Sequence, residues 1–188
     1  MAKAGDNLLT KSFSGTIGRL LTFRQIGCET FVSKYQRPPV IAIPTEKMTA
    51  ARTKFALATI YAKKVIQDPA FKALYQAAAK GGQRAFNIAI MDALHAPNVE
   101  SIQADNYHGG TAEHIIVTAT DDFKVASVTI SIWNASGDLV EQGKAVVQEN
   151  NLDWLYITIN KNSVLTGSKV TAIATDLPGN SHSLSISL

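Results

Sequence analysis

Cysteine is almost missing from this chain, because Cys28 is the single cysteine among 188 residues. An intramolecular disulfide is therefore excluded, and packing and hydrogen bonds must hold the fold together. No apolar run approaches the roughly 20 residues that cross a bilayer, and no apolar stretch with a cleavage site follows residues 1–7. We therefore expect no membrane span, no Sec-type signal peptide and a cytoplasmic location as synthesised, with export by a non-Sec route or release in a particle left open.

The sequence also lacks the short motifs that carry common enzyme chemistry. It has no Gly-x-Ser-x-Gly elbow, no Walker loop and no dinucleotide-binding fingerprint. The four histidines, His95, His108, His114 and His182, show no metal-ligand spacing, and no cysteine lies near them. We therefore expect a protein that is not an enzyme and that carries no cofactor and no metal.

Acidic residues are scarce in the first half of the chain, and basic residues are scarce in the second half. Residues 1–97 hold 14 Lys or Arg against five Asp or Glu, a net charge of +9, whereas residues 98–188 hold four Lys against ten acids, a net charge of −6. Such an asymmetry bears on association more than on fold. Opposite halves of two copies would meet head to tail, and contacts of that kind close into rings or continue as filaments.

What is present begins with two β-rich runs, at residues 19–25 and 28–35, separated by Gly27. They predict a β-hairpin. An isolated hairpin is marginal in water, so this one must pack on something. We expect it to dock on another subunit through one apolar face, with assembly residues Leu21, Phe23 and Phe31 as anchors and Arg19, Arg24 and Lys34 as the charged groups.

A Pro-rich connector at residues 37–44 leads to three predicted helices. Thr45 and Asp68 are the expected N-caps of the first and second helices, and Gly81-Gly82 is the expected stop of the second. The third is expected over residues 83–94. The first helix has one apolar face at spacings of three and four residues, formed by Met48, Ala51, Phe55, Ala58, Ala62 and Val65.

After residue 98 the apolar period changes to two, which is the period of a half-buried strand. Turn signals such as Gly109-Gly110 and Ser136-Gly137 separate the runs. Seven short strands at regular spacing predict an antiparallel sandwich of immunoglobulin-like type. The expected strands cover residues 99–104, 114–120, 126–133, 139–148, 153–160, 169–175 and 183–188.

Two stretches of this half carry a resemblance to a known family. Residues 118–128 contain D-x-x-V-x-x-V, from Asp122 to Val128, and residues 172–180 contain A-x-D-x-x-G-N, which ends at Asn180. Both motifs, with Trp154, resemble the bacterial immunoglobulin-like (Big-type) domain, which implies an Ig-like fold for about residues 98–188. The N-terminal half is similar to bacterial proteins of unknown function that open with a Gly-containing hairpin and a Thr-Glu-capped helix.

Acidic residues at the ends of the predicted strands are the candidate metal ligands. Asp121, Asp122 and Asp176 could meet at one pole of the sandwich, where converging oxygen atoms would suit calcium. The competing interpretation is that Asp121 and Asp176 close turns by accepting hydrogen bonds from backbone N–H groups. The second interpretation is the simpler one, and both stay open at this point.

The sequence as a whole predicts an α+β protein in three parts. They are an N-terminal hairpin arm with its connector (1–44), a three-helix segment (45–97) and a seven-stranded Ig-like sandwich (98–188). The expected function is that of a structural protein whose partner is another copy of itself. The alternatives are a binding module for carbohydrate or a surface partner and, less favoured, a nucleic-acid-associated protein, since basic and aromatic residues interleave in the hairpin without a known nucleic-acid-binding signature.

Overall fold

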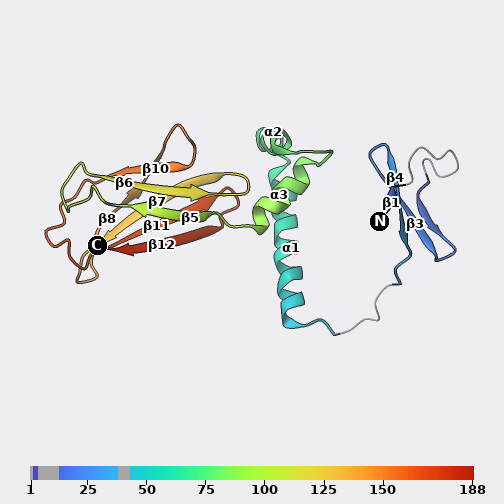
Figure 1. Ribbon diagram of the computed structural model, residues 1–188, viewed down its shortest axis with the longest axis horizontal. Helices are drawn as coiled ribbons and strands as arrows, with labels where there is room; N and C mark the ends of the chain where they lie inside the picture. The colour runs from blue at the N-terminus through green and yellow to red at the C-terminus, as the bar shows by residue number, and fades with distance from the viewer. Residues whose placement is uncertain (1, 4–12, 38–42) are drawn as a thin grey trace. The chain divides into compact units, whose positions relative to one another are not determined.

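The computed structural model describes residues 2–3, 13–37 and 43–188, and Figure 1 shows the order of their elements. The chain divides into two compact units, Met1–Thr49 and Ala50–Leu188. Most of the predicted connector, residues 38–42, lies outside the described residues. The domain boundaries predicted after residues 44 and 97 stay predictions.

The first unit contains a four-stranded antiparallel sheet in the order β1-β4-β3-β2. The strands β3 and β4 form the predicted hairpin, whose two-residue loop requires the positive φ of 64° at Gly27, which glycine adopts without steric cost. The hairpin prediction is thus confirmed, and a short strand extends it on each side. The bounds are β1, Ala2–Lys3; β2, Gly15–Ile17; β3, Leu21–Ile26; and β4, Glu29–Lys34.

Three helices follow, namely α1 (Glu46–Val65), α2 (Pro69–Ala78) and α3 (Ala85–Leu94). At the start of α1 the Thr45 hydroxyl accepts a hydrogen bond of 3.3 Å from a first-turn N–H, and at the start of α2 the Asp68 carboxylate accepts one of 2.8 Å. Both predicted N-caps are therefore confirmed.

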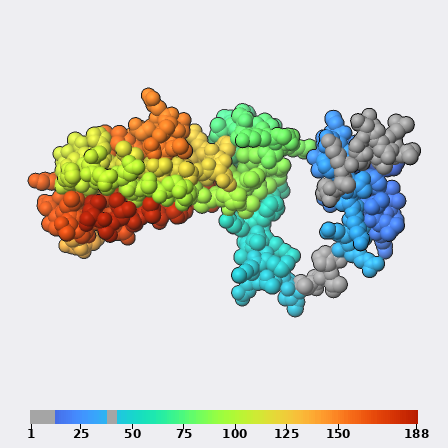
Figure 2. All heavy atoms as spheres, in the orientation of Figure 1, coloured from blue at the N-terminus to red at the C-terminus, as the bar shows by residue number. Residues whose placement is uncertain are grey.

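The apolar face predicted for α1 is only half covered. Ala58 and Ala62 are buried in the helical core, whereas Met48 and Phe55 on the same face are exposed. The reason is length, because α1 has 20 residues and the two helices beside it have ten each. In Figure 2 the N-terminal turns of α1 (cyan) project beyond α2 and α3 (green).

The C-terminal strands form two antiparallel sheets, β5-β6-β10-β9 and β12-β11-β7-β8. Alternate residues point into the core between the sheets, as in β6, where Ile115, Val117 and Ala119 are buried. The bounds are β5, Asn98–Gln103; β6, His114–Thr120; β7, Val125–Trp133; β8, Leu139–Lys144; β9, Val146–Val147; β10, Asp153–Ile157; β11, Lys169–Asp176; and β12, Ser181–Ser187.

The α+β class and the C-terminal sandwich are confirmed, with one difference in strand number. The run predicted as one strand at 139–148 divides at Ala145, where the chain passes from one sheet to the other. β8 pairs with β7, and β9 pairs with β10. The part of the chain that the structure describes therefore has eight strands in this region instead of seven. None of its helices is both long and apolar enough to cross a membrane.

The sandwich core contains side chains from the strands and their loops, and none from the helices. We therefore expect residues 98–188 to fold by themselves and to give a circular dichroism spectrum of β type. A spectrum typical of a disordered chain would show that the helices are required for the sandwich to fold.

Candidate functional site

The N-terminal sheet has one apolar face, which the strand register defines. Residues directly opposite each other in neighbouring strands lie on the same face of a sheet. Leu21 lies opposite Lys34 and, on its other side, opposite Ile17, while Phe23 lies opposite Val32. We call this surface, with Ile17, Leu21, Phe23 and Val32, the apolar face of the N-terminal sheet.

Much of the apolar face is open to solvent. Phe23 is buried, at 7% exposure, and its ring meets the ring of Phe13 edge-on at 5.8 Å. In contrast, Ile17 is 56% exposed, Leu21 is exposed beside it, and Leu20 in the adjoining turn is 72% exposed. Three neighbouring aliphatic side chains therefore face water on a sheet that has a small core of its own.

The opposite face is polar, and it corrects the predicted set of anchors. Phe31 lies opposite Arg24, and in β3 Arg24 alternates with Leu21 and Phe23. Phe31 therefore cannot share a face with Leu21 and Phe23, because successive strand residues point to opposite sides. Lys34, in turn, belongs to the apolar face, and Arg19 lies in the turn between β2 and β3 with a φ of 53°.

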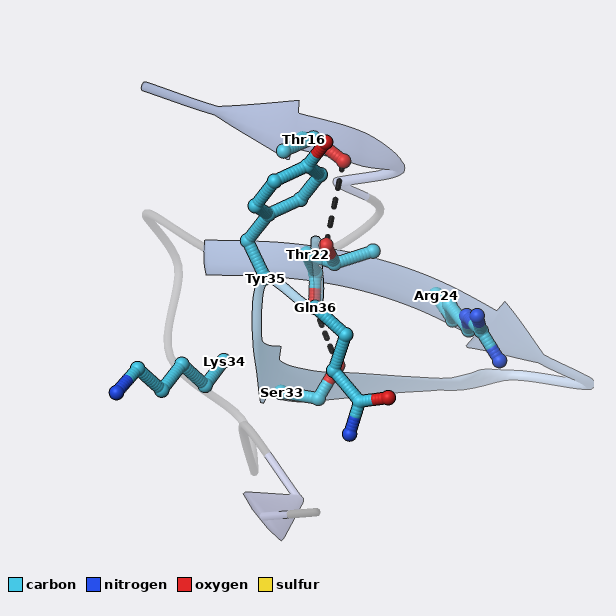
Figure 3. A pocket seen from close by; sticks show the side chains of 7 residues that line it. All are labelled: Thr16, Thr22, Arg24, Ser33, Lys34, Tyr35 and Gln36. Atoms are coloured by element: carbon cyan, nitrogen blue, oxygen red, sulfur yellow. Dashed lines mark hydrogen bonds between the residues drawn. The ribbon is translucent and has the colours of Figure 1, made fainter. Parts of the chain in front are cut away.

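The polar face of this sheet carries a hollow of about 430 Å³ (Figure 3). The Tyr35 ring reaches toward Thr16, whose hydroxyl lies 3.2 Å from that of Thr22. The Lys34 side chain points away from the others in this view. The sequence analysis missed this pocket, because its hydroxyl groups become neighbours only through the pairing of three strands. The lining residues are Thr16, Thr22, Arg24, Ser33, Lys34, Tyr35 and Gln36.

The predicted calcium ligands lie at turns of the sandwich, where they accept hydrogen bonds. Asp176 Oδ1 accepts from the backbone N–H groups of Gly179 at 2.7 Å and Asn180 at 2.6 Å. Asp121 Oδ2 accepts from Lys124 N at 2.9 Å. Both arrangements match the turn-closing interpretation. Within the described residues no group of three His, Cys, Asp or Glu side chains could hold a metal ion, and a calcium site stays a prediction.

The third predicted ligand, Asp122, lies where the sandwich contacts the helices. Its carboxylate pairs with His95 Nδ1, just after α3. The next residue, Phe123, stacks on Tyr75 of α2 with ring centroids 4.5 Å apart. Cys28 is exposed in the hairpin turn, far in sequence from these groups. The residues around Asp122 therefore join the sandwich to the helices.

Asn180 makes the second contact between sandwich and helices. Its side-chain amide lies within 3.4 Å of the carbonyl oxygens of Asp92 and Ala93 and within 3.2 Å of that of His95. The last carbonyls of a helix have no partner inside the helix, so an outside donor stabilises them. Asp176 Oδ2 accepts from the same amide at 2.8 Å and so fixes its orientation.

A buried chain of hydroxyl and carboxyl groups lies beside this contact. The Tyr75 hydroxyl donates to Asp92 Oδ2 at 2.6 Å, and the Tyr61 hydroxyl lies 2.9 Å from that of Tyr75. Because Tyr75 has one hydroxyl hydrogen and gives it to Asp92, Tyr61 must be the donor to Tyr75. Asp92 is almost fully buried, and its Oδ1 has no hydrogen-bond partner among the described residues.

Burial raises the pKa of Asp92 to about 7 from its ordinary value of 3.8. The negative charges of Asp121, Asp176 and Asp122 raise it further, and the hydrogen bond from Tyr75 opposes the rise. The pKa of Asp176 is also raised by burial, against the hydrogen bonds from Asn180 and Gly179. A carboxyl group that changes charge near neutral pH thus lies where helices and sandwich meet.

Aromatic side chains of the sandwich do not form an exposed platform of the kind that a carbohydrate-binding module uses. Tyr107, Trp154 and Tyr156 are buried, and Trp133 and Phe123 are half-buried. None of these five aromatic side chains, which the binding-module alternative would use, is fully exposed.

Comparisons with known proteins give partial likenesses. No protein-family model and no curated protein match the chain. One solved structure, the tetra-tandem repeat in the extending region of a large adhesion protein, is 21% identical over 47% of this chain and 22% of that chain, with a TM-score of 0.34. An engineered protein is 15% identical over 57% of this chain and 29% of its own, with a TM-score of 0.32. Likenesses this low assign no function, and the resemblance to the bacterial Ig-like family stays a prediction.

We expect Asn180→Ala to lower the free energy of unfolding of the chain by about 1–3 kcal/mol, because the terminal carbonyls of α3 and Asp176 lose their donor. Asn180→Asp should cost more, since it replaces the amide donor by a carboxylate facing Asp176. Chemical denaturation measures both. Equal stability of wild type and Asn180→Ala would show that this contact is dispensable.

The second expectation concerns pH and Asp92. The folded chain keeps the Asp92 proton up to about pH 7, whereas the unfolded chain loses it near its ordinary value of 3.8. The stability that this group contributes is therefore full below that lower value and is lost as pH rises through about 7. Asp92→Asn cannot ionise, so its stability relative to wild type should increase between pH 5 and pH 8, as followed by denaturation at each pH.

Tyr75→Phe provides a second variant for the same test. The hydroxyl that holds down the pKa of Asp92 is lost, so the fall in stability should begin at the same pH as in wild type but extend to higher pH. A difference between Asp92→Asn and wild type that stays constant from pH 5 to pH 8 would contradict the assignment.

Proposed function

We propose that this chain is a non-enzymatic structural subunit that associates with further copies of itself through the apolar face of its N-terminal sheet. The observation that carries the proposal is the group of exposed aliphatic side chains at Ile17, Leu20 and Leu21. They lie in a compact unit of their own, Met1–Thr49. An exposed apolar group of this kind on a small sheet is typical of an interaction surface.

The free energy gained by burying these three side chains supports a contact, but one that includes further interactions. Fully burying an Ile or Leu side chain contributes about 1.5–3 kcal/mol. Three of them supply roughly 5–9 kcal/mol, whereas association costs about 4–15 kcal/mol in lost freedom of motion. Hydrogen bonding along a strand edge, or further apolar area on the partner, has to supply the remainder.

Charge favours another copy as the partner. The first 97 residues carry a net charge of +9 and the rest a net charge of −6. The exposed basic residues of the sheet and of the segments beside its strands include Arg19, Arg24, Lys34 and Arg37. At about 0.1 M salt, opposite charges attract over roughly 10 Å, which speeds encounter and disfavours the approach of two like halves.

A binding module is the second candidate, and the polar pocket in Figure 3 favours it. Hydroxyl groups of Thr16, Thr22 and Ser33 line this pocket together with the ring of Tyr35 and the guanidinium-bearing Arg24. Such a set suits a ligand rich in hydrogen-bond acceptors. The pocket and the apolar face lie on opposite sides of one sheet, so the two candidates can be separated by substitution.

We expect Leu21→Asp to weaken self-association of the chain, because a carboxylate would have to be buried in the contact. Ile26→Asp is the matched control, since Ile26 is an exposed aliphatic residue of the same strand on the polar face. Sedimentation velocity of wild type and both variants, over a range of protein concentrations, measures the effect.

Deletion of residues 1–36 should give a folded monomer, since the helices and the sandwich have cores of their own. Loss of folding on deletion would assign the sheet to the core of its own chain. Association of Leu21→Asp at wild-type strength would place the contact on another surface.

A further inference from the structure

A lateral groove runs beside the edge strands of the sandwich. Two hollows, of about 410 Å³ and 670 Å³, share Val146 as a lining residue. The first lies against Tyr156, Ile157 and Ile159, and the second extends to Leu152. We call this surface the lateral groove of the sandwich.

The groove is rich in exposed aliphatic side chains. Ile159 is 74% exposed and Val146 is 67% exposed, and Val147, Leu152 and Ile157 are exposed as well. These residues come from β9, β10 and the segments beside them, so they are neighbours in space that no single apolar run of the sequence contains. A group of exposed aliphatic side chains of this kind is typical of an interaction site.

Strand edges border the groove on both sides. β8 is the last strand of one sheet and β9 is the last strand of the other. Edge strands carry backbone N–H and C=O groups that can pair with a further strand. β9 has only two residues, Val146–Val147, so most of β10 beyond its pair with β9 also borders the groove.

A glycine shapes the floor of the groove. An added Cβ at Gly143 of β8 would lie 2.7 Å from a ring carbon of Tyr156 and 2.9 Å from its hydroxyl oxygen. Any larger residue would therefore displace the Tyr156 ring, which is buried between the sheets. The absence of a side chain at this point lets the Tyr156 ring lie against the edge strand.

Three features indicate which occupant suits the groove. They are its exposed aliphatic side chains, the two strand edges beside it and the net negative charge of the sandwich. The occupant is an extended strand with apolar side chains from a basic protein surface. The N-terminal sheet offers an edge strand, β2, which carries the exposed Ile17, and the exposed Leu21 lies opposite Ile17 on the neighbouring β3. Residues 1–49, which include this sheet, hold seven Lys or Arg against three Asp or Glu, a net charge of +4 that is opposite to the −6 of residues 98–188.

We infer that the lateral groove of the sandwich binds the N-terminal sheet of a second copy, with β2 pairing along the β8–β9 side and Ile17 and Leu21 covering Val146 and Ile159. The inference rests on the proposed function and names the receptor for it. Pairing along a strand adds main-chain hydrogen bonds to the apolar contact, which is the contribution that three aliphatic side chains lack. Each copy has one sheet and one groove, so the contact is head to tail and can continue from copy to copy.

Complementation between two variants tests this arrangement. Val146→Asp removes the groove and Leu21→Asp removes the sheet as a partner. Each alone should associate about tenfold or more weakly than wild type, because a carboxylate would be buried without a partner. An equimolar mixture should form a heterodimer that grows no further, since one intact sheet and one intact groove remain. Sedimentation velocity of the full-length proteins measures all three samples.

Two further variants keep the test decisive. Ile159→Asp repeats the groove substitution at a side chain outside the strands, in case β9 does not tolerate a charge. Val164→Asp is the matched control, because Val164 is exposed but does not line either hollow. It should associate as wild type does.

The outcomes separate the groove from the sheet. Wild-type association of Val146→Asp and Ile159→Asp, with loss in Leu21→Asp, would overturn the groove as receptor and keep the proposed function. Wild-type association of Leu21→Asp would overturn the proposed function itself. A wild-type chain that is monomeric at every concentration would overturn both.

Discussion

The contact on which the second unit depends is the side-chain amide of Asn180 at the end of α3. Asp176 orients this amide through a hydrogen bond of 2.8 Å, and the amide faces the last carbonyl groups of the helix. The same turn thus closes the sandwich and satisfies a helix end that would otherwise lack donors. Phe123 stacked on Tyr75 supplies apolar area beside it. One short turn therefore joins the helices to the strands that follow them in sequence, and the two together form one compact unit.

This contact encloses the carboxyl group of Asp92, and burying the charged form of that group costs free energy. Asp92 is buried close to the negative charges of Asp121 and Asp176, and among the described residues its carboxylate has one hydrogen-bond donor, the Tyr75 hydroxyl. With a pKa of about 7, it is partly ionised at neutral pH. We therefore expect the attachment of the helices to the sandwich to weaken as pH rises through about 7.

The two units differ in how completely they bury their own apolar side chains. The sandwich has a continuous core from both sheets, whereas the N-terminal sheet buries Phe23 and leaves Ile17 and Leu21 exposed. A small sheet of this kind gains stability when its apolar face is covered. The sandwich in turn leaves a groove of aliphatic side chains, including Val146, along its open side. Each unit thus carries exposed aliphatic side chains among its described residues.

The sequence by itself determined the elements. Apolar periods of two and of three to four separated strands from helices, and Thr45 and Asp68 marked the helix starts, because these signals are local. The tertiary structure decided which elements meet. Pairing register placed Phe31 on the face opposite Phe23, and the crossing at Ala145 divided a single apolar run between two sheets. The burial and the raised pKa of Asp92 could not be predicted from the sequence. They come from residues up to 84 positions away, which only tertiary packing brings close to it.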